Sequence, residues 1–152
     1  GGYGALKAAL TLPERYGMCA AFSPACLFLK EGMEAQRKNG LNPEFVDRYG
    51  PRLLEDFRLT FGEDLEWKAE YEIMELARSA AGGKDKPAIY ACCGNDDPLL
   101  DDNRRLAGEM KELGLAYTYE EWPGEHNWFF FDQALKKTLV WLYGDGDFKN
   151  RP

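Results

Sequence analysis

Short apolar runs alternate with longer helical patterns along this chain, and this alternation most constrains its fold. Residues 18–23 and 87–93 are short apolar runs typical of buried strands, and residues 116–122 alternate as a strand does. Apolar residues recur at helical spacing before the first run and after the other two, at residues 2–12, 99–113 and 132–143. Strands that alternate with helices pair in parallel, because each helix carries the chain back along the sheet. We therefore predict an α/β fold, a parallel sheet with helices on both faces.

The region between the first two strands, residues 26–86, has a helical but irregular pattern. Asn42-Pro43 suits the cap and first position of a helix that Gly50-Pro51 would end. A second helix is predicted from the apolar spacing over residues 65–80, ending at Gly82-Gly83. Large apolar side chains are frequent here, and we expect most to pack onto the sheet and a minority to line a pocket: Phe28, Met33, Phe45, Tyr49, Phe57, Phe61, Trp67 and Tyr71.

The net charge and the cysteine pattern limit which binding partners and which cellular compartment we expect. The formal net charge is −7, whereas nucleic acids and anionic membranes are bound through basic faces, so neither is an expected partner. No apolar run approaches the roughly 20 residues of a membrane span. The four cysteines lack metal-site spacing, and Cys19, Cys92 and Cys93 lie in the apolar runs. We expect buried, reduced thiols and a cytoplasmic setting, with disulfides as the alternative.

Three parallel strands are few for a sheet of this kind, because each strand is normally buried on both faces and paired at both edges. Here the edge beside the first helix would stay open. We therefore expect the chain to be ordered only beside a missing amino-terminal half of its domain. That half would be a separate chain, further residues of the same polypeptide, or a swapped copy in a homo-oligomer.

Two positions near strand ends have the residue types for acid–base chemistry. His126 is the only histidine and follows the third strand through Pro123-Gly124, just before the last helix. An imidazole, with a pKa of about 6.5, takes and returns protons at neutral pH. Asp96 and Asp97 follow the second strand, at the edge where parallel sheets place their sites. Asp97 is preferred, because it directly precedes the apolar run that starts at Pro98; a plain helix-capping turn is the alternative.

The beginning of the chain, residues 1–7 (GGYGALK), matches the second half of a nucleophile elbow, G-x-S-x-G, in which a strand turns into a helix and presents a serine. Together with residues 93–97 (CGNDD) and 123–128 (PGEHNW), this segment resembles the putative-esterase family. That family includes tributyrin esterases, S-formylglutathione hydrolase and the feruloyl and acetyl-xylan types of family 1 carbohydrate esterases. A similar Gly-Gly-Tyr occurs in prolyl oligopeptidase-like peptidases.

The resemblance implies the carboxyl-terminal half of an α/β-hydrolase fold, a single partial domain over residues 1–152 with a helical cap-like insertion at 26–86. The longer protein of which this chain would be the carboxyl-terminal part would hydrolyse short acyl esters. The resemblance implies Asp97 as the acid and His126 as the base of its triad, and no metal or organic cofactor. The serine would lie two residues before Gly1, so we expect the chain alone to be inactive. A prolyl oligopeptidase-type peptidase fragment and a non-catalytic binding module remain alternatives.

Other residues are considered for the nucleophile and for the substrate pocket. Ser23 ends a predicted strand without the flanking glycines of an elbow, and Ser79 lies near a helix end, so neither is expected to replace the serine. Trp128 and Phe129 lie beside the histidine and are the better candidates for lining the pocket.

Overall fold

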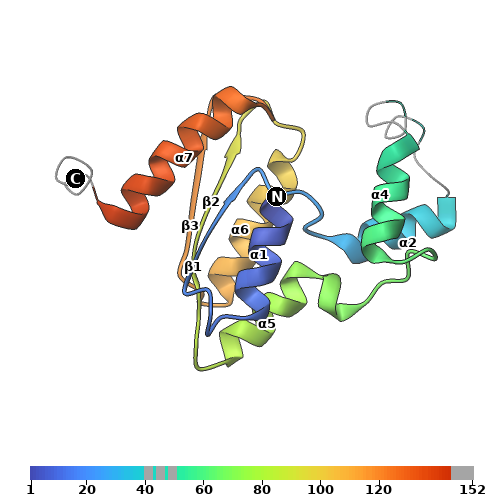
Figure 1. The fold of residues 1–152 in the computed structure, drawn as a ribbon, viewed down its shortest axis with the longest axis horizontal. Helices are drawn as coiled ribbons and strands as arrows, with labels where there is room; N and C mark the ends of the chain where they lie inside the picture. The colour runs from blue at the N-terminus through green and yellow to red at the C-terminus, as the bar shows by residue number, and fades with distance from the viewer. Residues whose placement is uncertain (40–42, 44–46, 48–50, 145–152) are drawn as a thin grey trace.

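The sheet has three parallel strands in the order β1-β2-β3. A computed structural model describes residues 1–39, 43, 47 and 51–144, and its strands are β1 (Met18–Phe22), β2 (Ala88–Gly94) and β3 (Tyr117–Trp122). In the register of the sheet, Cys19 pairs with Ile89 and Ile89 with Tyr117. The three predicted strands and their parallel arrangement are confirmed (Figure 1).

Helices cover both faces of the sheet, as predicted. Figure 1 shows α7 (Trp128–Tyr143) on one side of the strands and α1 (Gly2–Thr11), α5 (Ile73–Gly82) and α6 (Leu100–Glu112) on the other. Successive strand residues point to opposite faces. Ile89 therefore packs with residues of α1, α5 and α6, whereas Tyr90 and Cys92 pack with Phe130 and Ala134 of α7.

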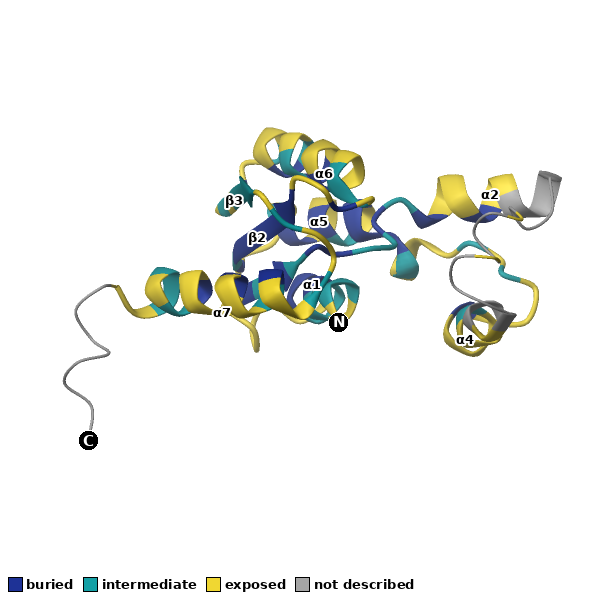
Figure 2. Cartoon of the chain, turned by 90° about the horizontal axis from the view of Figure 1, so that it is seen from above, coloured by how far each residue is buried: buried dark blue, intermediate teal, exposed yellow. Residues whose placement is uncertain are grey.

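A second group of helices stands away from the sheet (Figures 1 and 2). It comprises α2 (Leu29–Asn39), α4 (Pro51–Phe61) and the short 3-10 helix η1 (Ala69–Tyr71), and we call the described residues from 29 to 71 the outer segment. Its buried core is Leu29, Met33 and Phe61. The expectation that most aromatic residues here pack onto the sheet is wrong, because Phe57, Trp67 and Tyr71 pack around this separate core.

The remaining large residues of this region have different surroundings. Phe28 packs against the main core beside the sheet, and Phe45, Tyr49 and the proposed Asn42 cap lie outside the described residues. Tyr3 connects the outer segment to α1: its hydroxyl donates a hydrogen bond to the Tyr71 carbonyl oxygen at 2.8 Å. Burial raises the pKa of that hydroxyl.

Polar contacts hold the outer segment to the main core. Glu72 is buried, and its Oε2 accepts hydrogen bonds from the Lys30 backbone N–H at 2.9 Å and from Trp67 Nε1 at 3.1 Å. Arg105 of α6 donates two hydrogen bonds to Glu31 of α2, at 2.9 and 2.7 Å. Its guanidinium also lies 3.7 Å from the centre of the Phe28 ring.

Two helix boundaries differ from the sequence prediction. The helix expected over residues 65–80 is interrupted, because Leu65 has a left-handed φ of +47° and only residues 73–82 are α-helical. The last helix begins at Trp128 rather than at residue 132. Asn127 caps it, since its Oδ1 accepts hydrogen bonds from the backbone N–H groups of Phe129 and Phe130 at 3.1 and 3.2 Å.

Cys19, Cys92 and Cys93 are buried free thiols, as predicted, and Cys26 is free and partly buried. Burial raises the pKa of the Cys19 and Cys93 thiols to about 11 and that of Cys92 to about 12. Within the described residues, β1 pairs only with β2. Also within the described residues, no helix has the length and apolar character that crossing a membrane requires.

Candidate active site

The ends of β2 and β3 approach each other through two glycines. A Cβ atom on Gly94 would lie 2.2 Å from the carbonyl oxygen of Gly124, so no side chain fits there. The Asp96 backbone N–H donates to that same carbonyl oxygen at 3.0 Å, and the Asn95 N–H donates to the Trp122 carbonyl oxygen at 3.0 Å. These backbone contacts fix the loop after β2 against the loop after β3.

Asp97 is held in a turn at the end of β2. Its backbone N–H donates to the Gly94 carbonyl oxygen at 3.1 Å, and its side chain is fully buried. One carboxylate oxygen, Oδ1, accepts a hydrogen bond from the Leu99 backbone N–H at 2.9 Å. The other, Oδ2, lies 2.9 Å from Nδ1 of His126. Asp96 is exposed, so the structure brings to the histidine the carboxylate that we preferred.

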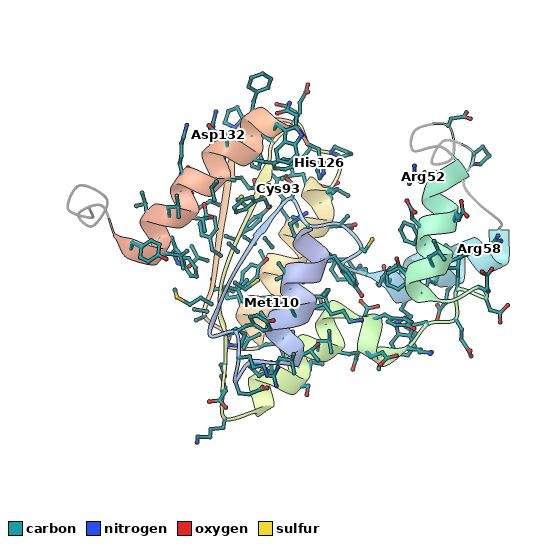
Figure 3. The ribbon with its side chains drawn as sticks, in the orientation of Figure 1. Arg52, Arg58, Cys93, Met110, His126 and Asp132 are labelled. Carbon is teal, nitrogen blue, oxygen red and sulfur yellow. The ribbon has the colours of Figure 1, made fainter. Side chains whose placement is uncertain are left out.

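His126 lies on the loop between β3 and α7, at the upper end of the sheet in Figure 3, near Cys93. Its side chain is 46% exposed, and its ring meets Phe131 edge-on with centroids 5.1 Å apart. A carboxylate at Asp97 accepts a hydrogen bond from Nδ1–H, so the ring carries its proton on Nδ1 and Nε2 keeps the lone pair. The pair can therefore take a proton from a donor in front of Nε2 and later return it.

The start of α1 lies at the same end of the sheet. Figure 1 shows the amino terminus next to the loop that follows β1. Gly2 touches the loop after β1, because a Cβ atom there would lie 2.8 Å from Cβ of Pro24. The resemblance places a serine just before this helix.

The other candidate residues differ in accessibility. Trp128 and Phe129 are 85% and 84% exposed on the first turn of α7, beside His126. Ser23 is 2% exposed and has a left-handed φ of +40°, so its hydroxyl is closed off from a substrate. Ser79 is exposed on α5, away from the strand ends.

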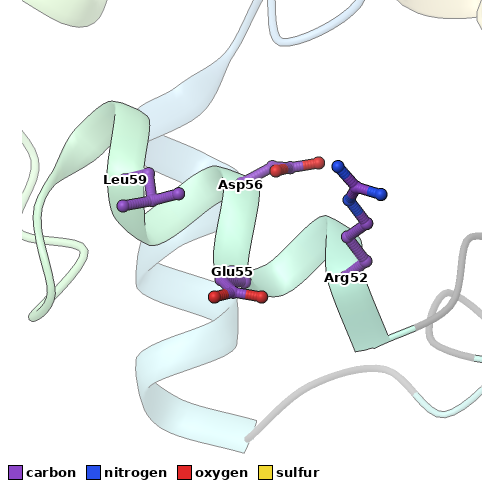
Figure 4. Close-up of a pocket in the computed structure, with 4 residues that line it drawn as sticks. All are labelled: Arg52, Glu55, Asp56 and Leu59. Atoms are coloured by element: carbon purple, nitrogen blue, oxygen red, sulfur yellow. The ribbon is translucent and has the colours of Figure 1, made fainter.

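A hollow of about 550 Å³ lies along α4, lined by Arg52, Glu55, Asp56 and Leu59 (Figure 4). Figure 3 shows Arg52 on the outer segment, well apart from His126, so this hollow is not part of the site. No group of three or more His, Cys, Asp or Glu side chains among the described residues could hold a metal ion.

The sequence analysis missed three contributions to the site: the contact between Gly94 and Gly124, the Leu99 N–H donor and the Phe131 ring. The place of Phe131 could have been predicted from Asn127, because an asparagine before an apolar helical pattern is a favoured cap and marks the start of the helix that carries Phe131. The glycine contact joins residues far apart in the chain, and no local pattern predicts it.

Comparisons with known proteins support the resemblance. The sequence model of a family described as "Putative esterase" matches residues 1–142. An acetyl esterase from Caldicellulosiruptor saccharolyticus is 28% identical over 142 residues, which cover 93% of this chain and 51% of that protein.

Solved structures share the fold. S-formylglutathione hydrolase (FrmB) from Staphylococcus aureus superposes with a TM-score of 0.66 at 22% identity, and serine hydrolase FphF from the same organism with 0.68 at 23%. Each match covers 93% of this chain and 50% of the other. A ferulic acid esterase superposes with a TM-score of 0.57 at 20% identity, and this match covers 93% of this chain and 46% of the esterase chain. The α/β-hydrolase fold is thereby confirmed, and the chain spans about half the length of these relatives.

Proposed function

We propose that this chain, which belongs to the putative-esterase family, supplies the base and the orienting acid of a serine carboxylesterase. The observation that carries the proposal is the 2.9 Å contact between buried Asp97 Oδ2 and His126 Nδ1. A buried carboxylate on one ring nitrogen fixes the tautomer that a base requires and stabilises the imidazolium formed during the reaction. Asp97 stays ionised throughout.

The proposed reaction has two halves. A serine on the residues that precede Gly1 in a longer polypeptide attacks the ester carbonyl carbon while His126 Nε2 takes its proton. The tetrahedral intermediate collapses to an acyl-enzyme, and His126 returns the proton to the departing alcohol. Water then attacks the acyl-enzyme carbonyl carbon and gives a proton to His126. The bond between the acyl group and the serine oxygen breaks, His126 returns the proton to that oxygen, and the carboxylic acid leaves. His126 thus acts first as base and then as acid in each half.

Short acyl esters of the tributyrin or acetyl type are the proposed substrates. Related proteins support this class by name, being an acetyl esterase, an S-formylglutathione hydrolase and a ferulic acid esterase. Trp128 and Phe129 offer apolar surface next to His126 for an acyl or alcohol group. A cytoplasmic setting belongs to the same proposal and is supported by the four free thiols.

The chain works, in this proposal, as part of a larger assembly. It forms one partial domain in which residues 26–86 are the cap-like insertion, and it needs an amino-terminal half beside β1. Exposed apolar side chains near that strand and on the nearby helices support such a contact: Leu12, Tyr16 and Met18, with Leu135 and Val140 of α7. The half comes from the same polypeptide, a separate chain or a swapped copy in a homo-oligomer.

The test compares two proteins. One is this chain alone, and the other is a longer polypeptide in which a G-x-S-x segment directly precedes Gly1. The longer polypeptide should react with a fluorophosphonate probe and hydrolyse p-nitrophenyl acetate, and the chain alone should do neither. His126→Ala in the longer polypeptide should lower kcat on the order of 10⁶-fold, as loss of the base does in a serine protease. Glu125→Gln, at the exposed neighbouring residue, is the matched control and should stay within about twofold.

Three results would contradict the proposal. Cleavage of peptides but not esters would favour the peptidase alternative, and absence of both labelling and hydrolysis would favour a binding module. Hydrolysis by the chain alone that disappears in His126→Ala would mean that another residue serves as the nucleophile.

A further inference from the structure

Asn103 is a polar residue on an otherwise apolar helix face. It is fully buried on the side of α6 that also carries buried Leu106 and Met110. Burying an amide without hydrogen bonds is costly compared with an apolar residue of similar shape. A leucine would suit this face better if packing were its only task, so the bonds of the amide indicate what the residue does.

The Asn103 amide joins two segments that are far apart in the chain. Its Nδ2 donates to the carbonyl oxygen of Leu99 at 2.8 Å and to that of Pro24 at 3.1 Å. Oδ1 has no hydrogen-bond partner among the described residues. The donor group therefore makes the connection, between the first turn of α6 and the loop after β1.

Each segment leads directly to one side of the proposed catalytic machinery. On the α6 side, Leu99 donates its backbone N–H to Asp97 Oδ1 at 2.9 Å, and Asp97 holds His126. On the β1 side, Pro24 is fully buried and touches Gly2, the first residue of α1. A single amide thus lies between the turn that holds the base and the start of the helix that follows the proposed serine.

The β1 side of this connection is held in an unusual backbone conformation. Ser23, directly before Pro24, has φ of +40°, and its N–H donates to the Cys92 carbonyl oxygen at 2.7 Å. A left-handed non-glycine residue persists where the surrounding contacts enforce it. The Asn103 bond to Pro24 is one such contact, and it prevents the loop from relaxing away from α6.

We propose that Asn103 is a positioning residue that sets the distance between His126 and the nucleophile by tying the Asp97 turn to the start of α1. This inference rests on the proposed function. A nucleophile and its base must lie within about 2.6–3.2 Å of each other, and a displacement of 1 Å costs on the order of 100-fold in rate. Asn103 touches neither the substrate nor the reacting atoms, and it acts only through Leu99 and Pro24.

The test uses two substitutions in the longer polypeptide, one that removes both hydrogen bonds of Asn103 and one that removes only the bond to Pro24. Asn103→Leu removes both hydrogen bonds at similar volume, and Asn103→Ser keeps a donor for Leu99 but cannot reach Pro24. Both should lower kcat about 10- to 100-fold, with KM changed less than about threefold. Leu106→Val, one turn further along α6, is the matched packing control and should leave kcat within about twofold.

A spectroscopic readout separates positioning from stability and from activity. His126 is the only histidine, so its ring ¹⁵N signals are unambiguous. The neutral ring should be in the Nδ1–H form in the wild type and in Leu106→Val, and should shift towards a mixture of tautomers in Asn103→Leu. If the wild type proves inactive, the proposed function fails and these signals still decide the role of Asn103. Unchanged kcat and unchanged tautomers in folded Asn103→Leu or Asn103→Ser would overturn the inference.

Discussion

The sheet and the outer segment are held together in different ways. In β2, Ile89, Ala91 and Cys92 are fully buried, with helices on both faces. In the outer segment the buried apolar core is limited to Leu29, Met33 and Phe61, and polar contacts from Glu72 and Arg105 fix its position. Both proposed catalytic residues follow strand ends, so the sheet with its buried central strand carries the proposed chemistry and the outer segment is attached to it.

The largest stability effect should come from a cavity in the sheet. Ile89→Ala removes a fully buried side chain from the central strand and should lower the free energy of unfolding by about 4 kcal/mol, within the usual range for such truncations. Phe61→Ala should instead loosen the outer segment alone. Hydrogen exchange measures both: Ile89→Ala should speed exchange across β2, whereas Phe61→Ala should affect α2 and α4. Equal loss of protection in β2 from both variants would mean that the two regions unfold together.

A methyl group at the contact between the strand ends should have the next largest effect. Gly94→Ala places Cβ against the Gly124 carbonyl and should cost about 3 kcal/mol, because backbone must move. It should also separate Asp97 from His126 and lower the proposed esterase activity of the longer polypeptide. Gly108→Ala is the control, since Gly108 is exposed on α6 and a Cβ atom there meets nothing within 4 Å. It should stabilise the protein by about 0.5–1 kcal/mol. Similar melting temperatures for the two variants would contradict the account of this contact.

Weakening the attachment of the outer segment should have the smallest effect. Glu72→Gln keeps the shape of the buried acceptor but removes its charge, and charge-assisted hydrogen bonds exceed neutral ones by about 1 kcal/mol. The protection of the amides at the start of α2 against hydrogen exchange should fall by about 1 kcal/mol. The His126 ¹⁵N signals should remain unchanged. Altered His126 signals would show that the outer segment helps to position the base.

Much of the sheet was predictable from sequence, because a buried parallel strand is a short apolar run and Ile89, Ala91 and Cys92 lie in such a run. The preference for Asp97 over Asp96 was also local, since it depended on the apolar residues that follow. The Gly94–Gly124 contact and the Asn103 bond to Pro24 connect distant residues, so periodicity gave no sign of them. The outer segment was predicted least well, because the left-handed Leu65 interrupts the helical spacing that its residues suggest.

The most direct test of the central claim compares the two neighbouring aspartates in the polypeptide that carries the intact elbow. Asp97 is buried against His126 and Asp96 is exposed, so the substitutions Asp97→Asn and Asp96→Asn change the same chemistry at adjacent positions. Asp97→Asn should lower kcat for p-nitrophenyl acetate by about 10⁴-fold, as loss of the triad carboxylate does in a serine protease, and Asp96→Asn should stay within about twofold. Equal losses in both variants, or full activity in folded Asp97→Asn, would contradict the assignment of Asp97 and His126 as the acid–base pair.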